Sequence, residues 1–595
     1  MNAVSPVETL VTDHLDLWTT ALKRKSNAGR GSSSKVELYG IRKLRELILE
    51  LAVRGLLVPQ DPNDEPAGEL LKKIAAEKAR LVKEGEIKKE KPSPPIAEYE
   101  KPFELPSGWA WSRWTNIAKK IGDIDHKMPN EEPDGIPYVS PRDFHPKNII
   151  DFSRAKKISQ SDFEKLAAKI QPRRGDIIFP RYGTIGENVL VESDIDFLAS
   201  YSCCVIKTLK GYISAKYQFF YSISAFVNQQ CRMAENKTTQ PNVGIKSIQE
   251  FVVPLPPLAE QHRIVAKVDE LMVLCDQLEQ ETEASLGAHQ TLVETLLSAL
   301  TSAADHAQFA SAWRRIAGHF DTLFTTEESI VQLKQTILQL AVMGKLVPQD
   351  PNDEPASELL KKIAAEKAKL VKEGKIKKEK PLPPIGKDER KFALPERWEW
   401  VRLANISDIQ SGIAKGKKYA SRAVIELPYL RVANVQRGFL ILDEMKMIEI
   451  LVSEQEKYAV KPRDLLITEG GDWDKVGRTA IWRDYPGPML HQNHVFKARL
   501  ILPAQNELWL EKYLNGPFAR EYFAGSSKQT TNLASINKTQ LSNTVLPIPP
   551  IAEQHRIVAK VDELMALCDQ LKSCLNAAQT TQLHLADALV EQAIC

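Results

Sequence analysis

The segment VPQDPNDEPAGELLKKIAAEKARLVKEGEIKKEKPSPPI at Val58–Ile96 occurs a second time at Val347–Ile385, with 35 of 39 positions identical. A second segment, PPLAEQHRIVAKVDELMVLCDQL at Pro256–Leu278, recurs at Pro549–Leu571 with 21 of 23 positions identical. The copies lie 289 and 293 residues apart, close to half of the chain, whereas the stretches between them have little sequence in common. A duplicated frame around two unlike domains predicts a molecule with approximate two-fold symmetry that recognises two different targets.

The composition limits the classes of protein to which the chain can belong. Its 595 residues suffice for several domains that each bury a core. The 80 Lys and Arg residues nearly balance the 77 Asp and Glu residues, so any nucleic-acid contact must come from local placement of charge. The seven cysteines form no C-x-x-C pair, which favours reduced thiols and no zinc site. Because no signal peptide and no membrane span of roughly 18 uncharged residues is found, we expect a cytoplasmic protein without a membrane partner.

Apolar residues at spacings of three and four predict several helices. The strongest is Val36–Arg54, which Gly55 ends, and its counterpart is Ile330–Met343, which Gly344 ends. Weaker or flanking segments are a helix over Val7–Lys25, a flexible tether over Ser26–Ser34, helices over Ala67–Glu84 and Ala356–Glu373, and an extended basic linker over Lys88–Pro95.

Two much longer helices are expected after the Pro-Pro junctions. In the first, from Ala259 to about Leu300, apolar residues from Ile264 to Leu278 alternate by four and three, as in a coiled-coil seam. The same seam returns from Ile557 to Leu575. About 40 residues would span about 60 Å, too long for the core of a small domain. We therefore expect the two stripes to meet as an antiparallel coiled coil, with two local helical hairpins as the open alternative.

Short apolar runs before glycine-containing loops, at Arg173–Gly186 and Pro462–Gly477, predict strands in the two variable domains. With the helices they predict an α+β protein, in which two α/β domains with mixed or antiparallel sheets alternate with the helical frame in a pseudo-two-fold repeat. The predicted division is an N-terminal helical region (1–104), a first recognition domain (105–255), a central helical region (256–393), a second recognition domain (394–547) and a C-terminal helix (548–595).

Particular phrases carry a family resemblance that covers nearly the whole chain. PLPPLAEQHRIV at Pro254–Val265 and PIPPIAEQHRIV at Pro547–Val558 each lead from a variable domain into a long helix, and GDIIFPRYGTIG at Gly175–Gly186 lies inside the first domain. In these motifs and in its duplicated frame the chain resembles the specificity subunit of type I restriction–modification systems, in the subfamily with a long region before the first variable domain.

The resemblance implies both function and partners. Each of the two domains would read one half of a bipartite, asymmetric site in double-stranded DNA. The helical frame would bind two modification subunits, which methylate adenine, and restriction subunits would complete a complex that cleaves DNA with ATP. S-adenosylmethionine, ATP and Mg would be used by those partners and not by this chain.

No catalytic motif is found in the sequence. It has no N-P-P-[YF] phrase for a flipped base, no glycine-rich phrase for S-adenosylmethionine, and no G-x-x-x-x-G-K-[ST] loop for ATP phosphates. We therefore expect no catalytic residue, no cofactor and no metal in this chain. Two rival hypotheses remain: a coiled-coil scaffold that binds only proteins, and a self-sufficient restriction enzyme.

Polar, glycine-bounded loops supply the candidate DNA contacts, because Arg, Lys, Asn and Gln read base edges or bind phosphates. Each recognition domain has four more basic than acidic residues, which suits one DNA-facing side. The candidates in the first domain are Arg181, Tyr182, Thr184, Lys237, Thr238, Thr239, Gln240 and Asn242. Those in the second are Lys415, Lys417, Lys418, Tyr419, Trp473, Lys475, Gln492, Asn493, Lys528, Gln529, Thr530, Thr531 and Asn532.

Structural alternatives exist for each group. Arg181 can instead pair with a nearby carboxylate, and any single Asn or Gln can be a turn or cap residue. The repeated AEQHR phrase favours a structural helix start or a partner contact over a histidine-based site. The basic runs Lys88–Lys91 and Lys377–Lys380 fit a solvated linker better than a DNA contact.

Overall fold

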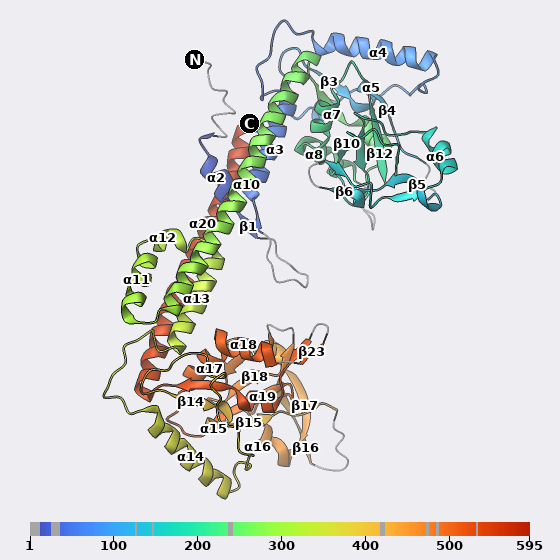
Figure 1. The fold of residues 1–595 in the computed structure, drawn as a ribbon. Helices are drawn as coiled ribbons and strands as arrows, with labels where there is room; N and C mark the ends of the chain where they lie inside the picture. Colours follow the sequence, from blue (N-terminus) through green and yellow to red (C-terminus); the bar gives the residue numbers. More distant parts are fainter. Residues whose placement is uncertain are drawn as a thin grey trace. The chain divides into compact units, whose positions relative to one another are not determined.

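The chain forms two compact units of similar construction (Figure 1). The computed structural model describes residues 12–24, 36–124, 128–145, 148–235, 242–416, 423–471, 475–483, 487–526, 528–530 and 533–594. One unit comprises residues 1–285 with 578–595, and the other comprises residues 286–577. Each unit holds one recognition domain and one copy of each repeated segment, so the duplication in sequence is a duplication of structure.

The short frame helices end close to where the sequence predicts, but their starts differ, because Val36–Glu37 form strand β2 and the second helix already begins at Glu327. Helix α3 (Tyr39–Arg54) ends at Gly55, whose φ of 73° is the left-handed conformation that glycine adopts without strain. Its counterpart α13 (Glu327–Val342) precedes Gly344 with a φ of 69°. The next helices are α4 (Ala67–Lys83) and α14 (Ala356–Lys372), each beginning directly after a proline.

The remaining frame elements are small. In the described part of the helix expected over Val7–Lys25, α2 (Leu15–Thr20) is helical but Lys23 and Arg24 are not. The tether over Ser26–Ser34 lies outside the described residues. The others are β1 (Lys23–Arg24), β2 (Val36–Glu37), α11 (His306–Ala317) and α12 (Phe320–Leu323).

Both long helices are continuous. Helix α10 runs over Leu258–Ser302 and α20 over Ile551–Ile594. In the first unit the beginning of α10 (Ile264, Val268, Leu271) shares a core with the end of α20. In the second unit the end of α10 shares a core with the beginning of α20. The helices are therefore antiparallel, as expected.

A third helix completes the bundle in each unit, which the sequence did not predict. In the first unit Lys43 of α3 pairs with Asp587 of α20 at 3.0 Å, and Arg45 pairs with Asp276 of α10 at 2.7 Å. In the second unit Lys334 of α13 pairs with Asp569 of α20. The apolar stripes thus face a shared core with α3 or α13 rather than only each other.

The first recognition domain is a mixed α/β fold. Its main sheet has the order β10-β9-β12-β4, a second has the order β11-β5-β8 with β11 parallel to β5, and β13 pairs with β3. Because β3 and β13 open and close the domain, this last pair ties its two ends together. The strands are β3 (Ala110–Arg113), β4 (Ala118–Gly122), β5 (Glu131–Val139), β6 (Phe144–His145), β7 (Ile149–Ile150), β8 (Lys156–Ile158), β9 (Ile177–Pro180), β10 (Val189–Leu190), β11 (Leu198–Ala199), β12 (Cys203–Thr208) and β13 (Val252–Leu255), and the helices are α5 (Trp114–Ile117), α6 (Gln160–Ala167), α7 (Ala215–Ser222), α8 (Ala225–Ala234) and α9 (Ile245–Glu250).

The second recognition domain has the same topology despite its different sequence. Its sheets are β15-β22-β18-β20, β17-β16-β21 and β14-β25, and a small extra sheet, β19-β24-β23, is added. The strands are β14 (Glu399–Arg402), β15 (Ser407–Ser411), β16 (Val424–Leu430), β17 (Lys446–Leu451), β18 (Leu465–Thr468), β19 (Gly470–Gly471), β20 (Thr479–Ile481), β21 (Leu490–His491), β22 (Val495–Leu500), β23 (Lys528–Thr530), β24 (Leu533–Ser535) and β25 (Val545–Ile548), and the helices are α15 (Leu403–Ile406), α16 (Gln455–Tyr458), α17 (Glu507–Asn515), α18 (Pro517–Ser526) and α19 (Lys538–Asn543).

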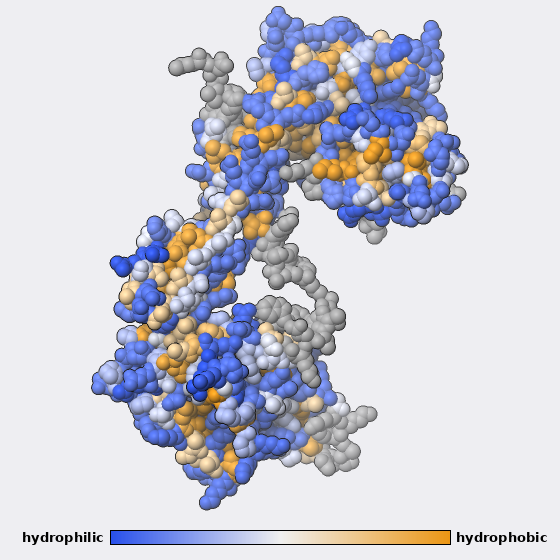
Figure 2. Space-filling model, in the orientation of Figure 1, coloured by the Kyte–Doolittle hydropathy of each residue, from blue (hydrophilic) through white to orange (hydrophobic). Residues whose placement is uncertain are grey.

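The visible surface is mostly hydrophilic, with apolar residues in separate patches (Figure 2). No helix in the described part of the chain is both long and apolar enough to cross a membrane. The six cysteines in those ranges are free, and all but Cys574 are buried.

Candidate nucleic-acid interface

In the first domain the structure brings two of the predicted segments together. The loop after β9 contains Gly183 and Gly186, with φ of 75° and 94°, so its chain reverses in conformations that favour glycine. Tyr182 forms an isolated bridge with Asn242, and the Val243 amide donates to the Arg181 carbonyl at 3.0 Å. The loop and the end of the Lys/Thr/Gln/Asn segment are therefore adjacent. Lys237, Thr238, Thr239 and Gln240 lie outside the described residues.

Arg181 itself is buried. Its Nη2 lies 2.7 Å from Asp123 Oδ2 and donates to the Tyr201 carbonyl at 3.0 Å, and its side chain is 5% exposed. Its guanidinium also lies 5.3 Å from the centre of the Tyr182 ring. This geometry matches the ion-pair alternative left open by the sequence, in which Arg181 holds the loop in place instead of facing solvent.

In the second domain four predicted segments converge. Strand β19, after β18, pairs with β24, which pairs with β23, so the loop after Glu469 meets the Lys528–Thr530 segment. The Ile413 amide donates to the His491 carbonyl, and the Asn493 amide donates to the Ile413 carbonyl, both at 2.9 Å. These bonds place the loop that carries Lys415 beside Gln492 and Asn493.

Gly412 makes this close approach possible. A Cβ at this position would lie 2.1 Å from the His491 carbonyl oxygen and 2.4 Å from the Gln492 carbonyl oxygen. No side chain fits there without separating the two backbones, which explains the glycine before the basic loop.

The other candidates differ in exposure. Thr184 and Lys415 are exposed, and Lys415 Nζ lies 5.7 Å from the centre of the Tyr429 ring. Tyr182, Asn242, Lys475, Gln492 and Asn493 are half-buried. Of Lys528, Gln529 and Thr530 the backbone alone is described, and Lys417, Lys418, Tyr419, Trp473, Thr531 and Asn532 lie outside the described residues.

Arg181 and Glu469 occupy the same place in the two domains. The Arg181 amide donates to the Ser202 carbonyl at 2.9 Å, and its carbonyl accepts from Val243. The Glu469 amide donates to the His494 carbonyl at 2.9 Å, and its carbonyl accepts from Ile536. The same position of the fold therefore carries opposite charges in the two domains. Arg181 pairs with Asp123, and the Glu469 carboxylate contacts His494 Nδ1.

Two residues at this place, Asp123 and His494, were missed by sequence reasoning. Asp123 and His494 have no sequence signal, because each meets its partner only through sheet pairing. His491 is fully buried, and its Nδ1 lies 2.7 Å from the Val495 carbonyl oxygen. Burial lowers the pKa of His491 to about 4, so the ring is neutral at pH 7 and serves the fold.

The repeated AEQHR phrase has a structural role in both copies. Glu260 accepts from Gln60 Nε2 at 3.2 Å, and Arg263 pairs with Asp64 at 2.7 Å, which pins the proline-broken turn to the start of α10. The same pair recurs as Arg556 with Asp353 at 2.6 Å. Within the described ranges no group of three or more His, Cys, Asp or Glu residues could hold a metal ion.

Comparison with known proteins gives consistent matches. A family model described as the type I restriction modification DNA specificity domain matches residues 106–287 and 395–578, more than half of the chain. The type I restriction enzyme EcoAI specificity subunit of Escherichia coli is 44% identical over 99% of this chain and 100% of its own length. The EcoEI specificity subunit of Escherichia coli is 41% identical over the same shares.

Solved structures give weaker matches. A chain from a study of assembly and conformational transition in a type I R-M system has 20% identity and a TM-score of 0.45, covering 83% of this chain and 99% of that one. The HsdS subunit from Thermoanaerobacter tengcongensis has 21% identity and a TM-score of 0.38, covering 83% and 98%.

Proposed function

Because the chain belongs to the DNA specificity subunits of type I restriction–modification systems and carries two of their recognition domains, we propose that it reads a bipartite, asymmetric site in double-stranded DNA. Each domain reads one half-site, and the chain itself carries out no chemistry. The long helices α10 and α20 set the gap between the half-sites.

One observation carries this proposal: two domains of the same topology present different side chains at the same place. At the convergence of the loops the first domain has Tyr182, Thr184 and Asn242, and the second has Glu469, Gln492 and Asn493. A shared backbone with different polar groups is what reading two different half-sites requires, since base edges are distinguished by donors and acceptors. In this proposal the exposed and half-buried loop residues contact DNA, while the Arg181–Asp123 pair positions the loop.

Partners supply the reactivity. Each unit carries one copy of the repeated frame, so two modification subunits bind and methylate adenine with S-adenosylmethionine that they hold. Restriction subunits, which use ATP and Mg, join this complex for cleavage. The complex acts in the cytoplasm, where its DNA substrate lies.

Methylome mapping tests this function. Cells that express the chain with its modification subunit should carry methylated adenines within one split motif, and a variant with residues 394–547 replaced by the corresponding domain of a relative should change only one half of that motif. A single contiguous motif, or changes in both halves, would contradict the proposal. The purified chain alone should transfer no methyl group.

A salt titration separates this function from the rival protein scaffold. DNA binding through several phosphate contacts weakens steeply with salt. The logarithm of the binding constant falls with the logarithm of the salt concentration, with a slope of about −0.9 per phosphate contact. A scaffold that binds only proteins should show no preference for the methylated motif over unrelated DNA of equal length.

A further inference from the structure

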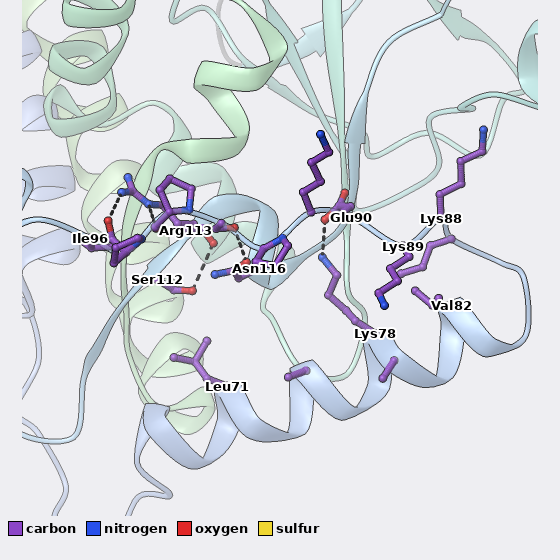
Figure 3. Close-up of a pocket in the computed structure, with 18 of the residues that line it drawn as sticks. Leu71, Lys78, Val82, Lys88, Lys89, Glu90, Ile96, Ser112, Arg113 and Asn116 are labelled. Atoms are coloured by element: carbon purple, nitrogen blue, oxygen red, sulfur yellow. Dashed lines mark hydrogen bonds and ion pairs between the residues drawn. The ribbon is translucent and has the colours of Figure 1, made fainter.

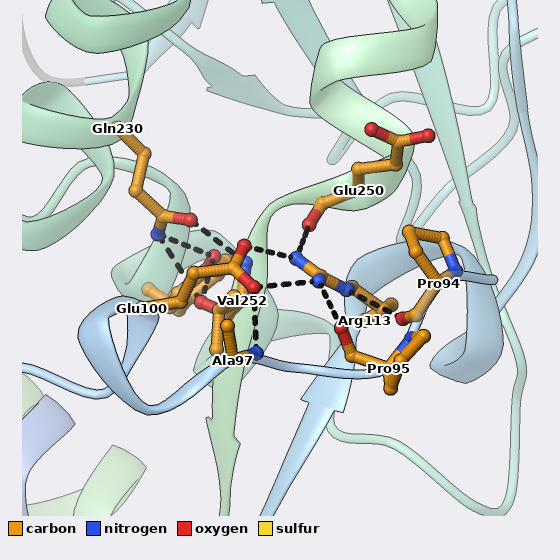
Figure 4. Close-up of polar contacts among 9 residues, drawn as sticks. Pro94, Pro95, Ala97, Glu100, Arg113, Gln230, Glu250 and Val252 are labelled. Atoms are coloured by element: carbon orange, nitrogen blue, oxygen red, sulfur yellow. Dashed lines mark hydrogen bonds and ion pairs between the residues drawn. The ribbon is translucent and has the colours of Figure 1, made fainter.

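The segment after α4 is held against the first recognition domain by one arginine (Figure 4). Arg113 donates to both carboxylate oxygens of Glu100 at 2.7 and 2.8 Å and to the carbonyls of Pro94, Pro95 and Glu250 at 3.3, 3.0 and 2.7 Å. These five bonds use all the donors of a guanidinium. Residues 87–96 form an extended strap, as predicted, and Arg113 fixes its C-terminal end to the domain.

The second unit repeats the arrangement. Arg402 donates to both carboxylate oxygens of Glu389 at 2.9 Å and to the carbonyls of Pro383, Pro384 and Asn543 at 2.9, 3.3 and 2.8 Å. The corresponding strap comprises residues 376–385.

A groove opens between each strap, the helix before it and the domain wall. Figure 3 shows the groove of the first unit. Its volume is about 810 Å³ in the first unit and about 740 Å³ in the second. On α4 the lining side chains include Leu71, Ala75, Ala79 and Val82, which share one helical face. This is a second apolar stripe, separate from the buried one of Leu70, Ile74 and Leu81, and its alanines are exposed.

The two cations of the groove wall, Arg113 and Lys78, are already paired within the chain. Arg113 has no free donor, and Lys78 donates to the Thr115 carbonyl at 2.5 Å and pairs with Glu90 at 3.4 Å. What remains available is the apolar stripe and an exposed basic rim formed by Lys88, Lys89 and Lys91. The groove thus offers apolar contact flanked by positive charge.

The two grooves are almost the same in their residues. In the repeated segment only Ser93, replaced by Leu382, differs among the lining positions. The identity includes exposed residues that no internal packing requires, such as Ala79 with Ala368 and Lys88 with Lys377. The recognition domains beside them have different sequences, so the grooves share a function that the domains do not.

We propose that each groove binds a segment of one modification subunit that carries apolar side chains flanked by acidic residues. The apolar side chains lie on the Leu71 and Val82 stripe, and the acidic residues face the lysine rim. Two nearly identical grooves account for two copies of one partner. This inference rests on the proposed function and adds to it the site and the chemistry of docking.

Nucleic acid is the less suitable occupant. The lysines would attract phosphates, but an aliphatic stripe offers neither hydrogen bonds nor a stacking surface to a base. The aromatic side chain that lines the first groove, Trp111, packs against Phe103 at 5.1 Å between ring centres.

Tryptophan substitutions test the groove. Ala79→Trp fills the first groove and Ala368→Trp the second. The full chain is purified with its modification subunit, and native mass spectrometry counts the subunits bound. We expect two for the natural chain, one for either variant and none for the double variant. Ala76→Trp and Ala365→Trp, exposed on the same helices but outside the grooves, are the matched controls and should retain two.

Charge reversal provides an independent readout that leaves the helix unaltered. Lys88→Glu, Lys89→Glu and Lys91→Glu together should weaken binding of one modification subunit by on the order of tenfold in low salt, and by less in high salt.

The outcomes separate this proposal from the function on which it rests. If the natural chain binds two subunits and the double tryptophan variant also binds two with equal affinity, the groove assignment is wrong and the function stands. If the lysine variants keep both subunits but lower the salt slope of DNA binding, the rim is a DNA surface. If the natural chain binds neither the subunit nor specific DNA, the proposed function itself fails.

Discussion

Removing the Arg181 guanidinium should destabilise the first recognition domain without changing the bases that it reads. In Arg181→Met the carboxylate of Asp123, whose side chain is 15% exposed, loses a partner at 2.7 Å. Breaking a buried ion pair from one side costs about 3–5 kcal/mol. Because Asp123 keeps some contact with water, we expect a loss at the lower end of this range. The free energy of local unfolding should fall by about 3 kcal/mol, which raises the equilibrium constant for local opening roughly 150-fold.

Hydrogen exchange measured peptide by peptide in the full chain suits this prediction, since a multidomain protein does not unfold in one step. Amides of β9 and β12 should exchange faster in Arg181→Met, while those of β18 in the second domain serve as an internal reference. Arg173→Met is the matched control: its pair with Asp196 is 54% and 52% exposed, so its loss should cost under about 1 kcal/mol.

Removing both partners gives a further check. In the double variant Arg181→Met with Asp123→Leu no charge is left buried, so at least half of the lost protection should return. Arg181 would instead be a base reader if Arg181→Met changed the free energy of local opening by less than about 1 kcal/mol and altered a base of the methylated half-site.

Three other substitutions or insertions test the arginine that holds the second strap, the buried histidine and the long helices. Arg402→Met should release the second strap, because the contacts that it removes are worth about 3 kcal/mol. Proteolytic cleavage within residues 376–385 should then be faster, and unchanged cleavage would show that Arg402 does not hold the strap. His491 has a pKa lowered by burial from 6.5 to about 4, so the unfolded chain binds its proton more tightly than the folded domain. Stability is therefore full above about pH 6.5 and falls toward pH 4 by up to about 3 kcal/mol, and His491→Gln should flatten this dependence in urea pulse proteolysis, whereas an equal slope in both proteins would contradict it. Inserting seven residues in both 278–292 and 571–585 should change the tolerated gap in the methylated motif, and a change in its bases instead would reject the spacer role.

Local sequence patterns were sufficient to place the helical frame. Helix periodicity and terminal glycines depend on neighbours within a few residues, so α3, α13 and the two long helices could be placed from spacing and from Gly55 and Gly344 alone. The internal repeat predicted two equivalent units, and the family motifs indicated the class of function.

The roles of residues that meet from distant parts of the chain depend on tertiary contacts. The pairing of Arg181 with Asp123, 58 residues earlier, depends on which strands are neighbours in the sheet. The convergence of the Lys415 loop with Gln492 likewise needs β-pairing and the space left by Gly412. The strap was predicted as a solvated linker because nothing in its own residues shows that Arg113 binds its carbonyl oxygens. Such contacts join segments far apart in the chain, and a local sequence pattern contains no information about which segments meet.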